Sequence, residues 1–440
     1  VSGALEVGAS VRLQPGELSA RVRGLQNHGV DTERVEAGVR AAVALVGDGI
    51  DAESLSRGQA VVAEPRWRES EMLTVRLRVL EGPEWRVAHG QRVRVHLGTA
   101  EVMGRVVLLS EGEAIEPGGA GWVQLRLEAP VVARTGMPVV VRSYSPVTTI
   151  GGGRVAEGWP GRRRRGSAGE AGLADLLEAR LSASTDARLV AALAAADVRG
   201  VAASALPLET GLPPARAEAA WSVERGRGGV EAADGTRFGS AVTGRVAGDL
   251  REVVDRTHTE EAFRAGAALA ALRALAPHDA HSALVDAVLE RERAEGRLQV
   301  SAGMVHRPGF APRFTPEQEE LGRRLRARYA EAGFAPPRFD DLAAEDRENP
   351  AFLSLVRRLE AEGVLVELED DLRIDAATLH AGVEGLRARF GPEEELTLAE
   401  FREVMDVSRR HLLPILGWLD RNGVTAFDGQ ARRLRAAARG

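Results

Sequence analysis

Four consecutive residues near the end of the chain, Ser408-Arg409-Arg410-His411, carry side chains suited to a phosphate-bearing ligand. Arginine has a permanent charge and a planar fork of N–H donors that matches the oxygens of a phosphate group. A serine before a helical segment is a favourable N-cap, because its hydroxyl accepts a hydrogen bond from an amide of the first turn. The sequence therefore predicts a helix that follows Ser408, with both arginines in its first turn.

The elements around these residues have the order of a winged helix-turn-helix. Residues 396–401 begin a short helix, residues 404–407 supply a turn, and Asn422-Gly423 ends the second helix before a two-stranded wing. Recognition helices of this kind contact nucleic acid through the residues near their N-termini. Arg409 and Arg410 are therefore the first predicted contacts.

The composition limits the classes of function. From residue 396 to the end there are eight arginines and five acidic residues, a local charge of +3 in a chain of net charge −6, which favours nucleic acid as a ligand. The chain has no cysteine, no apolar run near ~18 residues and no opening signal peptide, so we expect a cytoplasmic protein without disulfides or membrane spans. It also has no lysine, which a phosphate-binding P-loop requires.

The first third of the chain has the pattern of antiparallel β-structure. Residues 73–79 and 92–97 alternate between apolar and polar side chains, and turn residues recur about every ten positions. A break near Glu64-Pro65 divides the region into two predicted β-barrels, over residues 1–64 and 67–157. The first opens abruptly, as though its first strand were missing, so we expect it to be truncated at its N-terminus.

Two glycine- and arginine-rich segments follow these strands. Gly151-Gly152-Gly153 resembles a phosphate-binding loop, but neither a lysine nor a clear helix comes after it, so we predict a tight turn that closes the barrel. Residues 158–172 are predicted to be a linker. Its four arginines, Arg162 to Arg165, could touch RNA, although a solvated and flexible connector is the simpler interpretation.

From Leu173 onward helical spacing replaces alternation, and a repeat becomes visible. Four times a helix end is followed by glycine, an apolar strand, a tight turn and a second strand. The glycines at 229, 296, 363 and 423 lie 67, 67 and 60 residues apart, a period that fits one winged helix per repeat. The predicted winged-helix domains are residues 173–239, 240–311, 312–377 and 378–440.

The chain resembles the bacterial selenocysteine-specific elongation factors, the SelB family, without their N-terminal GTPase domain. The likeness covers nearly the whole chain and is strongest in residues 1–157 and 396–435. It is carried by RVRGLQNHG (21–29), EAGVRAAVAL (36–45), HGQRVRVHLGTAEVMGRV (89–106), RSYSPVTTIGGGRVAE (142–157) and SRRHLLPILGWLDRNG (408–423).

This resemblance implies a multidomain fold: two antiparallel β-barrels, equivalent to domains II and III of elongation factor Tu, followed by four tandem α+β winged-helix domains. It implies that the barrels bind selenocysteinyl-tRNA and that the last winged helix binds a hairpin in selenoprotein mRNA, on the ribosome and as a monomer. GTP and Mg would belong to the missing domain. We therefore expect no cofactor, metal site or catalytic residue in this chain, which is not itself an enzyme.

The resemblance also assigns site residues. The predicted RNA contacts are Ser408, Arg409, Arg410, His411, Arg432, Arg433 and Arg435. Arg40 matches an arginine of the selenocysteinyl pocket, where a guanidinium would pair with the selenolate; an ordinary surface residue is the alternative. Trp418 and Phe427 sit at core spacing and are expected to pack inside rather than stack on bases.

A winged-helix DNA-binding transcriptional regulator is the competing class. Such a regulator would have no need of the N-terminal β region in this form, so that region discriminates between the two classes.

Overall fold

The computed structural model describes residues 3–16, 18–51, 53–62, 67–82, 85–169, 172–391, 394–429 and 431–435. The chain divides into two compact units, of which the first comprises Val1–Asp249 with Arg273–Ala294 and the second Leu250–Leu272 with Glu295–Gly440. Within the described ranges, no helix is both long and apolar enough to cross a membrane.

The first strands form an open antiparallel sheet. They are β1 (Ala4–Glu6), β2 (Ser10–Gln14), β3 (Leu18–Asn27), β4 (Val30–Thr32), β5 (Arg34–Glu36), β6 (Ala41–Val46) and β7 (Ala60–Val62). The sheet order is β4-β3-β2-β7, β6 also pairs with β3, and β1 and β5 form a separate ribbon. Among the described residues this sheet does not close on itself, so the closed barrel expected for residues 1–64 is not seen. The predicted break at Glu64-Pro65 lies outside the described residues.

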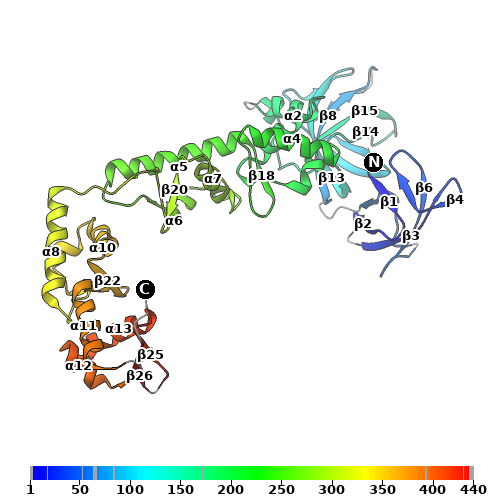
Figure 1. Ribbon diagram of the computed structural model, residues 1–440. Coiled ribbons are helices and arrows are strands. Elements are labelled where there is room, and N and C mark those ends of the chain that lie inside the picture. Colours follow the sequence, from blue (N-terminus) through cyan, green and yellow to red (C-terminus); the bar gives the residue numbers. More distant parts are fainter. Residues whose placement is uncertain are drawn as a thin grey trace. The chain divides into compact units, whose positions relative to one another are not determined.

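The next strands form a closed barrel, as alternation predicted (Figure 1). The barrel order is β10-β11-β13-β8-β15-β14, and a two-stranded ribbon joins β9 and β12. Its interior is filled by side chains such as Val75, Leu77 and Val95, which are fully buried. The strands are β8 (Glu69–Val79), β9 (Val87–Ala88), β10 (Arg92–Leu97), β11 (Ala100–Leu108), β12 (Ala114–Ile115), β13 (Ala120–Val132), β14 (Pro138–Ser143) and β15 (Thr149–Glu157).

The three consecutive glycines lie within β15, so the tight turn predicted for them is wrong. They pair on one side with β8 and on the other with β14. A Cβ on Gly153 would stand 2.0 Å from the backbone oxygen of Arg76, and one on Gly151 would stand 2.6 Å from that of Arg78. Glycine is required here because neighbouring backbone approaches more closely than any side chain permits.

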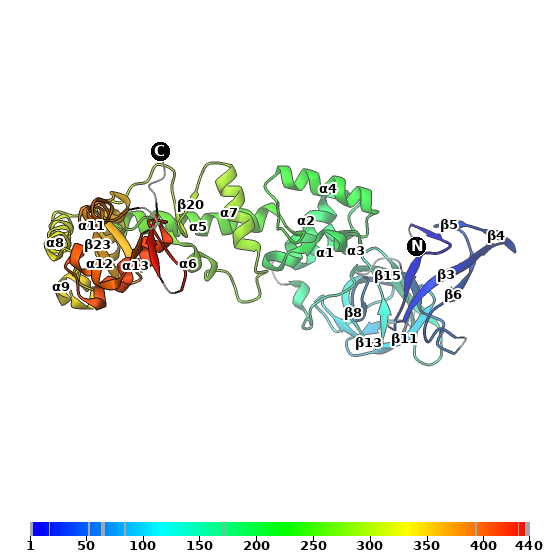
Figure 2. The same cartoon turned by 60° about the horizontal axis from the view of Figure 1, so that its bottom comes forward.

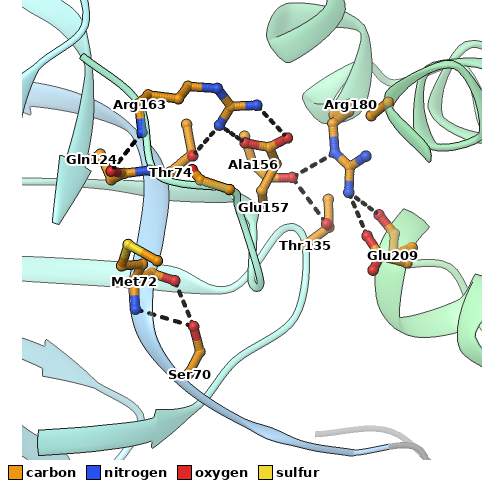
Figure 3. Close-up of polar contacts among 12 residues, drawn as sticks. Ser70, Met72, Thr74, Gln124, Thr135, Ala156, Glu157, Arg163, Arg180 and Glu209 are labelled. Carbon is orange, nitrogen blue, oxygen red and sulfur yellow. Dashed lines mark hydrogen bonds and ion pairs between the residues drawn. The ribbon is translucent and has the colours of Figure 1, made fainter. Parts of the chain in front are cut away.

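The segment after β15 lies on the barrel rather than forming the flexible connector that its composition suggested. The guanidinium of Arg163 pairs with the buried carboxylate of Glu157 and donates to Thr74 Oγ1 at 2.9 Å (Figure 3). Beside it, Arg180 donates to the carbonyl of Ala156 at 2.8 Å and to the carboxylate of Glu209 at 2.7 Å. These two ion pairs join the barrel, the segment and the first helices.

One order of elements, helix–strand–helix–helix–strand–strand, recurs along the rest of the chain. Figure 2 shows this part of the chain in green to red. The first instance lies in the first unit and is preceded by α1 (Leu173–Leu181). Its sheet has the order β16-β18-β17. Its elements are α2 (Thr185–Ala196), β16 (Val201–Ala202), α3 (Leu206–Thr210), α4 (Pro214–Gly226), β17 (Val230–Glu231) and β18 (Thr236–Phe238).

The second instance has parts in both units. Its three strands lie in the second unit, in the sheet order β19-β21-β20. Its elements are α5 (Ser240–Glu260), β19 (Ala267–Ala268), α6 (Leu269–Arg273), α7 (Leu284–Ala294), β20 (Gln299–Ser301) and β21 (Met304–His306).

The last two instances share a core in the second unit. Leu368 and Ile374 of the third pack with Leu412 and Ile415 of the fourth. In the third, an isolated bridge between Arg338 and Leu372 replaces the first strand. The elements are α8 (Pro316–Ala332), α9 (Ala344–Arg347), α10 (Phe352–Ala361), β22 (Leu365–Glu369), β23 (Leu372–Asp375), α11 (Ala376–Arg389), β24 (Glu395–Leu396), α12 (Leu398–Met405), α13 (Arg409–Arg421), β25 (Thr425–Phe427) and β26 (Arg432–Leu434).

In three of the four instances an arginine on the last strand pairs with a carboxylate on the third helix. These pairs are Arg237 with Glu218, Arg373 with Glu360, and Arg432 with Asp420. The guanidinium is less than 15% exposed each time. Because a shielded ion pair with several hydrogen bonds fixes geometry well, it sets where the wing lies relative to the helix.

The glycine-dense strand gives a stability test. We expect Gly153→Ala to lower the free energy of unfolding by about 3 kcal/mol, because the added methyl group forces β8 and β15 apart. Gly161→Ala is the matched control, since no heavy atom lies within 4 Å of its added Cβ. Urea unfolding followed by circular dichroism measures both. Equal stability of the two variants would contradict the close-packing explanation.

Candidate nucleic-acid interface

The predicted recognition helix is α13, and Ser408 occupies its N-cap position. The Ser408 side chain makes no capping bond to a helix amide, so that part of the prediction is wrong. Its hydroxyl lies 3.1 Å from Nδ1 of His411 instead, while its backbone carbonyl accepts from the amides of His411 and Leu412. The His411 imidazole thus takes the place of a helix amide as the partner of the Ser408 hydroxyl. This contact holds the ring at the start of the helix.

Arg409 and Arg410 are both exposed at this helix start, as predicted. Arg410 is 65% exposed and makes a long ion pair, 3.8 Å, with Asp341 of the preceding repeat. No acidic residue lies in the first turn of α13. The partial positive charge of the helix N-terminus thus adds to the two guanidinium charges, an arrangement that favours an anion.

His411 is half-buried beside these arginines. Burial of the ring, together with the charges of Arg410 and Arg338, lowers the pKa of His411. The imidazole is therefore neutral at neutral pH, where it offers hydrogen bonds rather than charge.

The three wing arginines differ from one another. Arg432 is 14% exposed, binds both oxygens of Asp420 and lies over the ring of Phe427. Arg433 pairs with Glu395 and Asp428. Arg435 is exposed, and no ion pair involves it within the described ranges. Arg435 is thus the wing cation best placed for a ligand, whereas the geometry gives Arg432 an internal role.

Phe427 is 55% exposed, so its assignment to the core is wrong. It is the last residue of β25. Trp418 is partly buried and packs against the core, as expected. The exposed ring of Phe427 lies beside Arg432 and offers a flat apolar face. Phe427 lies at the end of a short strand, just before Asp428-Gly429. This position in the sequence could have indicated an exposed ring, but the prediction considered spacing alone.

Arg40 lies in the loop before β6, in the N-terminal sheet. It is exposed and makes no ion pair in the part of the chain that the structure describes. The neighbouring Val39 is 50% exposed. An exposed guanidinium of this kind is available to an anionic ligand.

Two family models match this chain, one in each unit. Residues 73–160 match the β-barrel domain of selenocysteine-specific elongation factors, and residues 389–434 match the winged helix of elongation factor SelB. The first match covers the closed barrel, and the second covers α12, α13 and the wing. Both modules occur in selenocysteine-specific elongation factors, and the β-barrel match disfavours the DNA-binding regulator.

Two similar proteins agree with these models. The chain is 26% identical over 442 residues to the selenocysteine-specific elongation factor of Desulfomicrobium baculatum, which covers 99% of this chain and 68% of that protein. The crystal structure of a bacterial selenocysteine-specific elongation factor matches with a TM-score of 0.59 at 19% identity, over 99% of this chain and 65% of that one. At that identity the likeness concerns the fold, and the chain spans about two thirds of both relatives.

The closed barrel and the last winged helix of this chain are thus of the type found in the SelB family of selenocysteine-specific elongation factors.

The internal role of Arg432 can be tested against Arg435. Burial raises the pKa of Asp420, but hydrogen bonds from Arg432 and Thr425 outweigh it and lower that pKa. We expect Arg432→Ala to lower the free energy of unfolding by about 1–2 kcal/mol, since a partly buried carboxylate loses its partner. Arg435→Ala should change it by less than about 0.5 kcal/mol. Urea titration of the whole chain measures both.

The pH dependence has a defined sign. Because the pKa of Asp420 is depressed in the folded state, the pair stabilises above the ordinary carboxyl pKa, and this stabilisation is lost as pH falls through the lowered value. The Arg432→Ala effect should therefore shrink in acid. An unchanged urea midpoint combined with lost RNA affinity would instead make Arg432 a ligand contact.

Proposed function

We propose that this chain binds an mRNA recoding hairpin through its last winged helix and selenocysteinyl-tRNA through its β domains, for selenocysteine insertion at UGA on the ribosome. The observation that carries the hairpin half is the start of α13. There Arg409 and Arg410 are exposed, no acid lies in the first turn, and a helix N-terminus adds positive charge.

RNA hairpins suit this surface for a second reason. Sequence-specific RNA recognition targets loops and bulges, whose unstacked bases can stack on aromatic rings and on guanidinium planes. Phe427 supplies an exposed ring on the wing, and Arg435 supplies an exposed cation beyond it. Ser408 and the neutral His411 add hydrogen-bonding groups at the helix start. The surface thus combines charge for phosphates with a ring for one base.

The domain organisation supports the tRNA half of the proposal. We assign residues 1–64 and 67–157 to the two β domains that would hold the aminoacyl end and stem of the tRNA. Residues 173–239, 240–311, 312–377 and 378–440 would be four winged helices. The protein would act as a cytoplasmic monomer, and GTP with Mg would bind a separate domain.

The role of the recognition helix is tested by removing both exposed arginines at the start of α13. We expect Arg409→Ala with Arg410→Ala to weaken binding of a selenoprotein mRNA hairpin by about 1–3 kcal/mol for each arginine replaced, because each guanidinium–phosphate contact also releases a counterion. Gel-shift titration at fixed salt measures the affinity.

Arg326→Ala with Arg328→Ala is the matched control. Both lie exposed on α8, and removing them changes the charge of the same unit equally. Equal affinity of the wild type and the Arg409/Arg410 double variant would contradict the proposal that the start of α13 contacts the hairpin. A duplex DNA that outcompetes the hairpin would return the chain to the regulator class.

Arg40 is tested through the identity of the aminoacyl group. A selenolate is anionic at neutral pH whereas a seryl hydroxyl is not, so a fixed guanidinium favours the former. We expect Arg40→Ala to lower the affinity for selenocysteinyl-tRNA about tenfold and to leave that for seryl-tRNA unchanged. Hydrolysis protection of the aminoacyl ester reports both. Arg23→Ala, an exposed arginine of β3, is the control, and equal losses for the two tRNAs would reduce Arg40 to a surface residue.

A further inference from the structure

A basic cleft of about 450 Å³ lies on the outer face of the closed barrel, far along the chain from α13. It is formed where the segment after β15 crosses β11 and β13. Its lining residues are His89, Val107, Arg126, Arg162, Arg163, Arg164 and Arg165. No carboxylate is among these residues.

Backbone and side-chain hydrogen bonds hold the arginine-rich segment in place. Gln124 donates to the carbonyl of Gly161 at 2.8 Å and accepts from the amide of Arg163 at 3.2 Å. Arg126 donates to the carbonyl of Arg163 at 2.9 Å, and Arg165 donates to that of Gly112 at 2.8 Å. The cleft is therefore preorganised, so a ligand would not have to order it on binding.

The arginines of this segment face two ways. Arg163 is turned into the barrel, where Glu157 neutralises it. Arg162, Arg164 and Arg165 are exposed, and none of them makes an ion pair within the described ranges. The inward pair fixes the backbone, and the outward side chains are left with no internal counter-charge.

Arg126 shows that the positive charge here is uncompensated. Burial and the neighbouring charge of Arg162 lower the pKa of Arg126. Its Nε is buried without a hydrogen-bond partner, although its Nη2 holds the segment. Elsewhere on the same barrel Arg92 and Arg94 pair with Glu128 and Glu101. Among the arginines that line the cleft, Arg163 pairs with Glu157, whereas Arg126, Arg162, Arg164 and Arg165 make no ion pair within the described ranges.

The lining also defines the class of ligand. It contains no phenylalanine, tyrosine or tryptophan, so it has no ring on which a base could stack. Guanidinium groups match phosphate oxygens in charge and geometry. Several cations along one extended segment suit a row of phosphates rather than a single small anion. These features select the sugar–phosphate backbone and not the bases.

We propose that this cleft binds the phosphate backbone of an RNA independently of base sequence, as an RNA contact separate from the one at α13. The choice of RNA over another polyanion rests on the proposed function. The contact should respond to salt but not to sequence, because phosphate contacts carry no sequence information.

The experiment separates the two contacts. In the Arg409→Ala, Arg410→Ala background, binding of a short fluorescein-labelled RNA duplex of unrelated sequence is followed by anisotropy over a salt series. Adding Arg162→Glu and Arg164→Glu should weaken binding at least tenfold and lower the salt slope by about 2. No hydrogen bond holds either guanidinium among the described residues, so the fold should persist, as thermal melting by circular dichroism verifies.

Arg216→Glu with Arg225→Glu is the matched control, since both lie exposed on α4 of the same unit. Retained binding in that control supports a local site. Equal losses in the two charge-reversal variants would overturn the cleft in favour of bulk charge. Displacement of the duplex by low millimolar phosphate would overturn the RNA assignment in favour of a small-anion site. The anisotropy measurement of duplex binding does not depend on the outcome of the hairpin test at α13. Either proposal can therefore be contradicted without the other.

Discussion

The interaction on which this structure depends is the ion pair between a shielded guanidinium and a carboxylate on a neighbouring element. Every strong cation of the chain is an arginine, and desolvating one is costly unless a carboxylate faces it. Such pairs join the barrel to the segment after it and the wings to their helices. They are Arg163–Glu157, Arg180–Glu209, Arg237–Glu218, Arg373–Glu360 and Arg432–Asp420. Because breaking one leaves a buried charge, they fix geometry more than they add stability.

The same pairing divides structural arginines from those available to a ligand. On the last wing, Arg432 and Arg433 are neutralised within the repeat, while Arg435 faces solvent. After β15, Arg163 is neutralised while its neighbours are not. The number of arginines in a region therefore overstates how many are available to a ligand, because many of them form ion pairs that hold the fold together. A candidate surface is better identified by how few carboxylates face its arginines. The first turn of α13 contains no acidic residue, although Asp341 lies 3.8 Å from Arg410, and no carboxylate lines the cleft on the barrel.

Much of this fold follows from sequence periods, because burial imposes them. Alternation predicted the closed barrel, and glycines about 65 residues apart predicted the recurring wing. The third and fourth wings even place an acid three residues before that glycine, at Glu360 and Asp420, and its arginine partner nine or ten residues after it. The failures arose where tertiary contact overrides local preference. The local sequence around Gly153 indicates a turn, because it does not show that the backbone of β8 approaches this glycine closely. Spacing alone likewise did not show that Phe427, the last residue of β25, is exposed.

The net negative charge of the chain contrasts with its two local arginine-rich surfaces. A net charge of −6 disfavours attraction to nucleic acid at long range. Within a Debye length of roughly 8 Å at physiological salt, only the nearest charges count, and there the two arginine surfaces prevail. Each alone would hold RNA weakly and release it quickly. Two such contacts on one chain make the second binding event intramolecular whenever the geometry lets both engage. Affinity would then depend on simultaneous engagement, which suits the proposed role of binding a message and afterwards releasing it.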